Sequence, residues 1–363
     1  MASPKQLVVA SLNVAVETCS AALESISDAP HDSDGPDLAV LHKDFTSILT
    51  LLYASTTKLC LALKPISPTY SASLSPLKDI SDQVSALSHC VCLLEHKHGI
   101  TLIQEITSIA KEVIQSIRSL VQAFLDIEKS GQRAASGKAG DEYMVRVGAV
   151  HEIIRNARSL SEDNLAAVKK KLAQDHSSLK DGVEEVDEMI KAHESGAEVD
   201  VEDDSDGWDE LGVEKKQMDG EELERAKKTY AILRLSTLLH NHIIKDILSP
   251  PNLKFSPHLI QNLDSLPPQS STLLIASDDL ISTIYAPQNP SDISTELASF
   301  TKLIGALQSI ILALSQKPTL SEQLQAMSLG GTTQKDPKKW FEMCFLQIQK
   351  AAENLKSTLS IRH

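Results

Sequence analysis

The sequence is poor in aromatic residues and shows no sign of β-structure. Phe, Trp and Tyr together make up only 4% of the 363 residues, whereas hydrophobic residues as a whole make up 42%. A core of this composition must consist mainly of Leu, Ile, Val and Ala, which favours the packing of helix on helix. No stretch alternates between apolar and polar residues over a useful strand length, so we expect an all-α protein.

Basic residues are fewer than acidic residues and form no Arg-rich face. The chain has 35 Lys and Arg against 49 Asp and Glu, and its formal net charge is −14. Nucleic-acid binding depends on clustered Lys or Arg side chains that contact phosphates. We therefore expect no direct nucleic-acid partner.

Cysteine is scarce, and its pattern does not suggest disulfide bonds. The five cysteines are scattered and odd in number: Cys19, Cys60, Cys90, Cys92 and Cys344. This is typical of reduced thiols that are buried as small hydrophobic side chains.

Neither a targeting segment nor a membrane span stands out. The N-terminal stretch MASPKQLVVASLNVAV has one Lys before apolar residues, as a signal peptide does, but Asn13 and Glu17 break the apolar run. Its apolar residues also follow helical periodicity, so we favour a first helix over a signal peptide. Spanning a bilayer takes about 18 uncharged apolar residues or more. No segment reaches that length, and we expect no transmembrane segment.

One acidic run divides the chain. Residues 194–211, ESGAEVDVEDDSDGWDEL, contain nine Asp and Glu and no Lys or Arg. Such a run is typical of a solvated linker without fixed structure. The sequence therefore predicts two antiparallel helical bundles joined by an acidic linker. The N-terminal bundle covers 1–193 with five or six helices, the linker covers 194–218, and the C-terminal bundle covers 219–363.

Apolar residues recur at three- and four-residue steps through most of the chain, which places them on one face of successive helices. Prolines mark several boundaries: Ser75 before Pro76 predicts the start of a helix, and Pro267–Pro268 predicts a break between two short helices. The expected helices span about 5–28, 37–64, 75–99, 101–129, 141–160, 161–193, 219–249, 257–266, 269–285, 291–316 and 336–360.

Trp208 is the candidate functional residue with the clearest physical reason. A large apolar ring within DSDGWDELG is costly to leave in water. Either it docks onto the protein's own helices, or it anchors in a partner's groove while the acidic neighbours steer the segment toward a basic surface. The candidate partner-binding residues are Asp206, Trp208, Asp209, Glu210 and Leu211.

The most specific metal candidate is the set His89, Cys92 and His96. On one continuous helix these residues lie three and four positions apart and could share a zinc ion, but no second ligand pair follows elsewhere. The alternative, which we favour, is a helix with core cysteines and exposed histidines, and we expect no metal site. His240 and His242 are two positions apart, so they point in different directions on a helix, and we expect surface or capping histidines.

The remaining motifs do not support catalysis. SGKAG at 136–140 lacks the Walker spacing and a preceding strand. The acidic run lacks the EF-hand pattern for Ca²⁺. Nothing in the sequence brings Ser, His and Asp or Cys and His together. We therefore expect no catalytic residue, no cofactor and no enzymatic activity.

The overall layout resembles the cyclin-D-binding-protein family, also called the GCIP-like family. Three segments carry the resemblance: DDSDGWDELG at 203–212, EELERAKKTYAILRL at 221–235, and DPKKWFEMCFLQIQKAAENLKSTL at 336–359. The likeness covers essentially the whole chain in layout, although its motifs are diffuse and include no catalytic signature.

The resemblance implies an all-helical, non-enzymatic regulator of cell-cycle progression in cytoplasm and nucleus. Family members look like proteins that bind D-type cyclins and restrain proliferation, and they have been described as helix–loop–helix proteins without a basic region. Expected partners are therefore proteins such as cyclins or transcription regulators. The alternative is a helical adaptor similar to vinculin or talin for cytoskeletal or membrane-associated proteins, whose rod modules share this low-aromatic composition.

Overall fold

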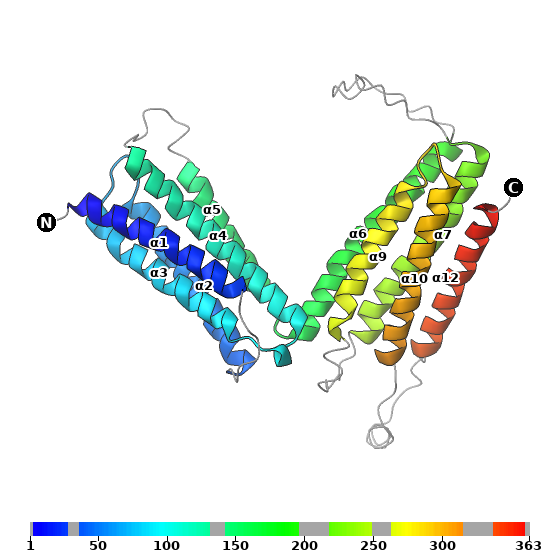
Figure 1. Ribbon diagram of the computed structural model, residues 1–363, viewed down its shortest axis with the longest axis horizontal. Helices are drawn as coiled ribbons and strands as arrows, with labels where there is room; N and C mark the ends of the chain where they lie inside the picture. The colour runs from blue at the N-terminus through cyan, green and yellow to red at the C-terminus, as the bar shows by residue number, and fades with distance from the viewer. Residues whose placement is uncertain are drawn as a thin grey trace, which may run out of the picture. The chain divides into compact units, whose positions relative to one another are not determined.

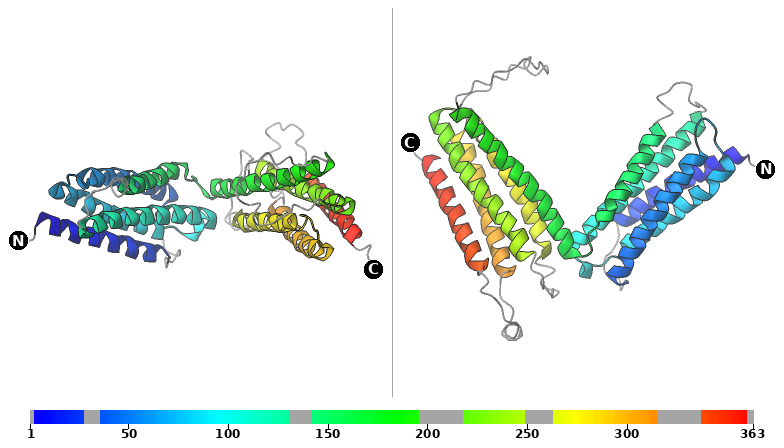
Figure 2. Two further views of the ribbon diagram at one scale, coloured as in Figure 1. Left: turned by 90° about the horizontal axis from the view of Figure 1, so that it is seen from above. Right: turned by 180° about the vertical axis from the view of Figure 1, so that it is seen from behind.

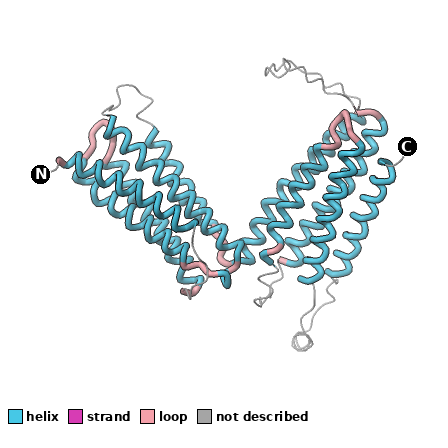
Figure 3. The backbone as a smooth tube through the Cα atoms, viewed as in Figure 1, coloured by secondary structure: helices cyan, strands magenta, loops and turns pink. Residues whose placement is uncertain are grey.

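The protein is built from helices. The computed structural model describes residues 3–27, 36–130, 142–195, 218–248, 263–314 and 337–359, and every regular element within these ranges is helical (Figure 1, Figure 3). This confirms the all-α class. The chain forms two compact units, Met1–Ala167 and Val168–His363.

The described part of the first unit is a bundle of five long helices. α3 packs against α1 and α2, α4 packs against α1 and α5, and α2 packs against α5. The elements are α1 (Pro4–Ser27), α2 (Leu38–Ala62), α3 (Tyr70–Cys92), the 3-10 helix η1 (His96–His98), α4 (Ile100–Ser130), α5 (Glu142–Asn156) and the 3-10 helix η2 (Ala157–Ser159).

The core is mainly aliphatic, as the composition predicts. Buried Leu, Ile, Val and Ala from α1 to α5 form its cluster in the first unit. The few phenylalanines are nevertheless used in the interior, since the largest fully buried side chains of the described residues include Phe45, Phe124, Phe300, Phe341 and Phe345. An aromatic side chain buries about 150–250 Å², so these few residues contribute strongly to packing.

The third helix starts earlier than expected. α3 begins at Tyr70, and Pro76 lies inside the helix instead of at its start. The added turn is fixed by packing and by a side-chain contact: Ser73 is buried, and Tyr70 Oη donates to Glu128 Oε2 on α4 at 2.9 Å. These contacts offset the backbone hydrogen bond that a proline within a helix cannot make.

The described part of the second unit contains five long helices, the first of which starts in the first unit. α7 packs against α12, and α10 packs against both α9 and α12. The elements are α6 (Asn164–Glu194), α7 (Gly220–His242), the π-helical turn η4 (Ile243–Ile247), α9 (Leu266–Ser282), α10 (Pro290–Leu314) and α12 (Pro337–Leu359).

The boundary between the two units lies upstream of the acidic run. The sequence had predicted that the acidic run itself separates the two units. From Val168 onward α6, expected in the N-terminal bundle, belongs to the second unit. Side chains explain this: Asp175 on α6 accepts a hydrogen bond from Ser270 on α9, and Glu194 pairs with Lys227 on α7. In sequence, the acidic run therefore connects two helices of the same unit.

The predicted break between two short helices is present, but it falls at Ser265, and the proline pair at 267–268 lies just after it in the first turn of the second helix. α9 starts at Leu266 and carries both prolines in its first turn, where the missing N–H groups would have no helical partner. Leu266 and Pro267 are buried, so the turn packs into the unit. Most of the helix expected at 257–266 lies outside the described residues.

Three described helices are more apolar than the sequence analysis allowed. By length and composition alone, α1, α2 and α10 are long and apolar enough to cross a membrane. Composition therefore does not support the expectation of no transmembrane segment. In this structure each of the three helices buries an apolar face in its bundle, for example Leu12 of α1, Leu52 of α2 and Phe300 of α10.

Candidate functional site

The helices α6 and α7 lie side by side in the second unit (Figure 1, Figure 2). An open groove is lined by residues of both helices. The two helices are antiparallel: Glu194 Oε1 lies 2.8 Å from Lys227 Nζ at one end, and the rings of His176 and His240 lie 5.7 Å apart at the other. The groove has a volume of about 730 Å³. Its lining consists of His176, Lys180, Tyr230, Ala231, Arg234, Leu235, Thr237, Leu238 and Asn241.

The groove combines apolar surface with positive charge. Leu235 and Leu238 are part of its lining on α7, and Leu238 is 44% exposed. Lys180 on α6 and Arg234 on α7 carry positive charge, and none of the nine lining residues is acidic. Lys180 Nζ lies 2.9 Å from Glu184 Oε1, one turn further along α6.

His176 adds an uncharged ring to the groove at neutral pH. Burial lowers the pKa of His176, and the nearby Lys245 and Lys180 lower it further. The charges beside the ring are therefore those of the lysines. Arg234 adds a further positive charge to the lining, although the chain as a whole is acidic.

A buried polar network next to the groove joins α6, α7 and α9. Ser270 Oγ donates to Asp175 Oδ2 at 2.7 Å and lies 2.7 Å from His240 Nε2. Ser271 Oγ donates to the same carboxylate oxygen at 3.1 Å, and Lys171 Nζ lies 3.0 Å from Asp175 Oδ1. Because Ser270 gives its only proton to Asp175, His240 must carry its proton on Nε2 and donate it to Ser270.

This Asp, Ser and His set does not have the geometry of a hydrolase triad. In a triad the histidine lies between the serine and the carboxylate, whereas here Ser270 lies between Asp175 and His240. Ser270 is also only 2% exposed, so no substrate reaches its hydroxyl. Burial, reinforced by His176, lowers the pKa of His240 to about 4, which leaves the ring neutral near pH 7. The network therefore ties three helices together.

The partner-binding residues expected from the sequence lie outside the described residues. Asp206, Trp208, Asp209, Glu210 and Leu211 all fall within 196–217. The acids considered for Ca²⁺ fall almost wholly in the same range, and the SGKAG segment at 136–140 is also outside the described residues.

The three zinc-ligand candidates do not share one helix. α3 ends at Cys92, and His96 belongs to η1, so the helical face that would align His89, Cys92 and His96 does not exist. Cys92 Sγ lies 3.8 Å from the backbone oxygen of Ser25. Among the described residues, no group of three His, Cys, Asp or Glu side chains is arranged to hold a metal ion.

The structure corrects the expectation for His240. This residue is only 1% exposed, because α6 and α9 cover its side of α7. His242 does lie nearer the surface: its ring stacks on Trp340 of α12 with a centroid separation of 3.7 Å, and its Nδ1 lies 2.7 Å from Asp246 Oδ2. The expectation of a surface or capping residue is thus wrong for His240 and fits His242.

The cysteines are free thiols, as the sequence predicts. Four of the five are buried, and Cys92 is partly buried. Burial raises the pKa of Cys19 and Cys60 to about 12 and that of Cys90 and Cys344 to about 11. These four thiols stay protonated, which makes them poor nucleophiles.

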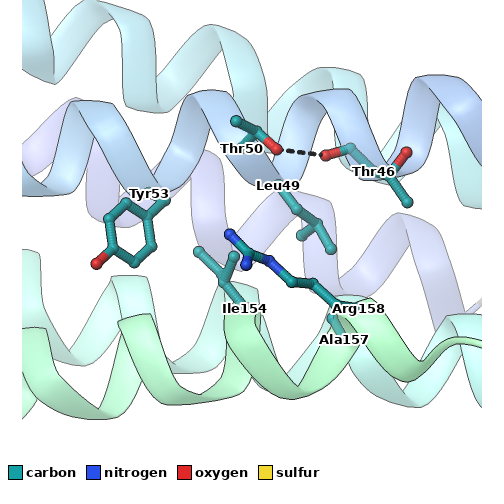
Figure 4. Close-up of a pocket in the computed structure, with 7 residues that line it drawn as sticks. All are labelled: Thr46, Leu49, Thr50, Tyr53, Ile154, Ala157 and Arg158. Carbon is teal, nitrogen blue, oxygen red and sulfur yellow. Dashed lines mark hydrogen bonds between the residues drawn. The ribbon is translucent and has the colours of Figure 1, made fainter.

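A smaller pocket lies in the first unit between α2 and the α5–η2 segment (Figure 4). Tyr53 and Arg158 lie beside it, and Thr50 Oγ1 donates to the backbone oxygen of Thr46 at 2.9 Å on its α2 side. Its volume is about 120 Å³, whereas ligand pockets usually measure about 300–1,000 Å³. The groove between α6 and α7 is therefore the stronger candidate for a binding site.

Two family models match the chain in sequence order. The model described as Grap2 and cyclin-D-interacting, N-terminal, matches residues 44–192, and its C-terminal counterpart matches residues 201–309. The chain belongs to the Grap2 and cyclin-D-interacting family. The family resemblance noted from the sequence is thereby confirmed. Comparison with curated proteins gave no match.

Both walls of the groove fall within the regions that the family models match. α6 lies almost entirely in the N-terminal match, and α7 lies in the C-terminal match. The groove was not predicted from the sequence, although one wall shows a helical spacing of Tyr230, Arg234, Thr237 and Asn241. The other wall, α6, could not be paired with α7 from the sequence, because the sixth helix was predicted to belong to the N-terminal bundle.

Proposed function

We propose that this protein is a non-enzymatic regulator of cell-cycle progression that acts by binding a D-type cyclin. The observation that carries the proposal is the family match: two models whose descriptions name interaction with cyclin D match 44–192 and 201–309 in order. Together the two matches cover most of the 363 residues.

The geometry supports a role in binding. Helical bundles recognise partners through grooves that accept a helix, and the α6–α7 groove is open, apolar in part and positively charged. The Asp175, Ser270 and His240 network, which has the residue types of a hydrolase, is sealed from solvent and tied into packing. These features favour a scaffold for protein partners over an enzyme.

The direct test is a titration of the purified full-length chain with a purified D-type cyclin, with a cyclin of another class as the control. We expect saturable binding with a dissociation constant of about 1 μM or lower, and at least about tenfold weaker binding to the control cyclin. No binding at about 100 μM of either protein would contradict cyclin recognition. Co-sedimentation with actin filaments or lipid vesicles would instead favour the alternative adaptor function.

The residues around Trp208 form part of the same proposal. We infer from the sequence that Asp206, Trp208, Asp209, Glu210 and Leu211 contribute to partner binding. Trp208→Ala should then weaken cyclin binding, whereas Ile275→Ala, an exposed residue of α9, should not. Equal affinities of the two variants would remove Trp208 from the binding surface.

The proposal also places the protein in cytoplasm and nucleus. A fluorescent fusion at native expression level should label both compartments and remain in the soluble fraction after cell lysis. Because α1, α2 and α10 have the apolar composition of membrane-spanning helices, a fusion that is found only in membranes would contradict this part of the proposal.

A further inference from the structure

The α6–α7 groove has the length and the apolar surface that a helix needs. Ala231, Leu235 and Leu238 recur at steps of four and three residues along α7, so they form one row. The lining from Tyr230 to Asn241 covers about 16 Å at a rise of about 1.5 Å per residue. This corresponds to about three turns of a docked helix, the usual extent of recognition by a helix in a groove.

Positive charge borders this apolar row. Arg234 stands on α7, Lys180 stands on α6, and Lys245 of η4 is close enough to affect the pKa of His176. Acids of α6 lie close to these groups: Glu184 pairs with Lys180, and Asp187 pairs with Lys191. The pKa of Asp187 is lowered by Lys191 and also by Tyr230 and Arg234 of the lining. A ligand that places carboxylates beside Arg234 and Lys180 would match the groove's charge.

We propose that the groove between α6 and α7 binds an acidic amphipathic helix of a partner protein. Apolar side chains of that helix pack on Leu235 and Leu238, and its Asp or Glu side chains pair with Arg234 and Lys180. The inference rests on the proposed function in that it takes the partner to be a protein. It goes further by naming the surface and the chemistry of the bound segment.

Four single variants separate this surface from the rest of the unit. Leu238→Asp places a charge in the apolar row, and Arg234→Glu reverses the charge beside it. The matched controls are Ile275→Asp on α9 and Lys302→Glu on α10, which change exposed residues outside the groove lining. Circular dichroism melting of all four full-length variants checks that each one folds.

The probe is a displayed library of 14-residue amphipathic helices with a fixed leucine row and random flanking residues, sorted against the full-length protein. We expect enrichment of sequences rich in Asp and Glu, at least about tenfold weaker binding to both groove variants, and unchanged binding to both controls. A peptide whose acids are replaced by Lys should regain binding to Arg234→Glu, which a misfolded variant would not allow. Absence of enrichment, enrichment of basic peptides, or equal binding to groove and control variants would overturn the proposal.

The D-type cyclin distinguishes failure of this inference from failure of the proposed function. Cyclin binding that the groove variants weaken about tenfold supports both. If the groove variants bind the cyclin as tightly as the unchanged protein does, the groove is not the cyclin's docking surface. If acidic peptides bind the groove but the cyclin does not bind, the inference holds and the proposed function fails.

A variant in which the acidic residues of 198–206 are neutralised tests whether the chain's own acidic run occupies the groove. If only this variant binds peptides, that run is the occupant and a partner helix is not.

Discussion

Ser270 determines how two buried ionisable groups coexist in the second unit. Its hydroxyl bridges these groups, because it donates a hydrogen bond to the Asp175 carboxylate and accepts one from His240 Nε2. A buried carboxylate without such donors is costly, and so is a buried imidazole N–H without an acceptor. A single hydroxyl therefore joins three helices into one polar network.

We expect Ser270→Ala to destabilise the second unit by about 1–3 kcal/mol, because the N–H of His240 then has no acceptor. The measurement is the urea midpoint for the second unit, followed by hydrogen–deuterium exchange of α7 and α9. Ser309→Ala, at an exposed serine that bonds only the backbone of its own helix, should change stability by less than about 0.5 kcal/mol. Equal midpoints for the two variants would show that the network contributes no stability.

Protonation of His240 should destabilise the folded state in mild acid. Burial lowers its pKa from the ordinary 6.5 to about 4, so between these values the unfolded chain binds a proton that the folded chain excludes. The stability from this group is present above pH 6.5 and is lost as the pH falls toward 4, with about 2 kcal/mol lost between pH 7 and pH 5. His240→Gln, which retains an N–H donor but does not titrate, should lose less stability over this interval. Parallel stability curves for the two proteins would contradict this.

Residue-level prediction from the sequence succeeded where burial alone decides the outcome. The cysteines follow their hydrophobic character into the core, and the sequence was sufficient to predict this. His240 shows the limit: its burial depends on Asp175 and Ser270, which are far from it in sequence and are brought together only by tertiary packing. The groove residues Arg234 and Lys180 were missed for the same reason.

At the scale of elements, the start of α7 is fixed by a reciprocal cap. Asp219 Oδ1 accepts from the N–H of Glu222 at 2.7 Å, and Glu222 Oε2 accepts from the N–H of Asp219 at 2.9 Å. Glu222 Oε1 also accepts from the backbone N–H of Gln288 at 2.8 Å. The cap thus links the first turn of one groove wall to the segment that precedes α10.

We expect Asp219→Ala to cost about 1 kcal/mol, because the first turn of α7 loses its side-chain acceptor. Amide exchange in residues 220–224 should become faster. Asp219→Asn keeps an oxygen at the same position and should retain most of the stability. If Asp219→Asn were as unstable as Asp219→Ala, the negative charge would matter more than the cap.

The helices themselves could largely be predicted from the periodicity of Leu, Ile and Val, because that periodicity directly reports the buried face. Their boundaries were harder where proline was used as the signal. Pro76 is accommodated inside α3 by packing of the extra turn, and Pro267–Pro268 begins α9. A proline limits which conformations are allowed, but tertiary contacts decide which allowed conformation is used.

For the whole molecule, the assignment of α6 was the main difference between sequence and structure. A run of nine acids looked like a division between domains, and the family models also meet near residue 200. The compact units nevertheless divide at Ala167 and Val168, because the apolar stripe of α6 packs in the second unit. Composition locates a polar run, but it does not show which elements on either side pack together.

Two fragments of the second unit test this arrangement. Fragment 164–363 contains α6 and should unfold cooperatively, whereas fragment 219–363 lacks it and should bind a hydrophobic dye and lose fixed side-chain packing. The reason is that removing α6 exposes the apolar partners of Leu179, Val186 and Ile190, which are at most 7% exposed in the structure, and takes Asp175 from the buried network. Near-ultraviolet circular dichroism and dye fluorescence measure the difference. If both fragments unfolded with equal cooperativity, the second unit would fold without α6. The domain boundary would then lie at the acidic run, and the groove between α6 and α7 would not be part of the second unit.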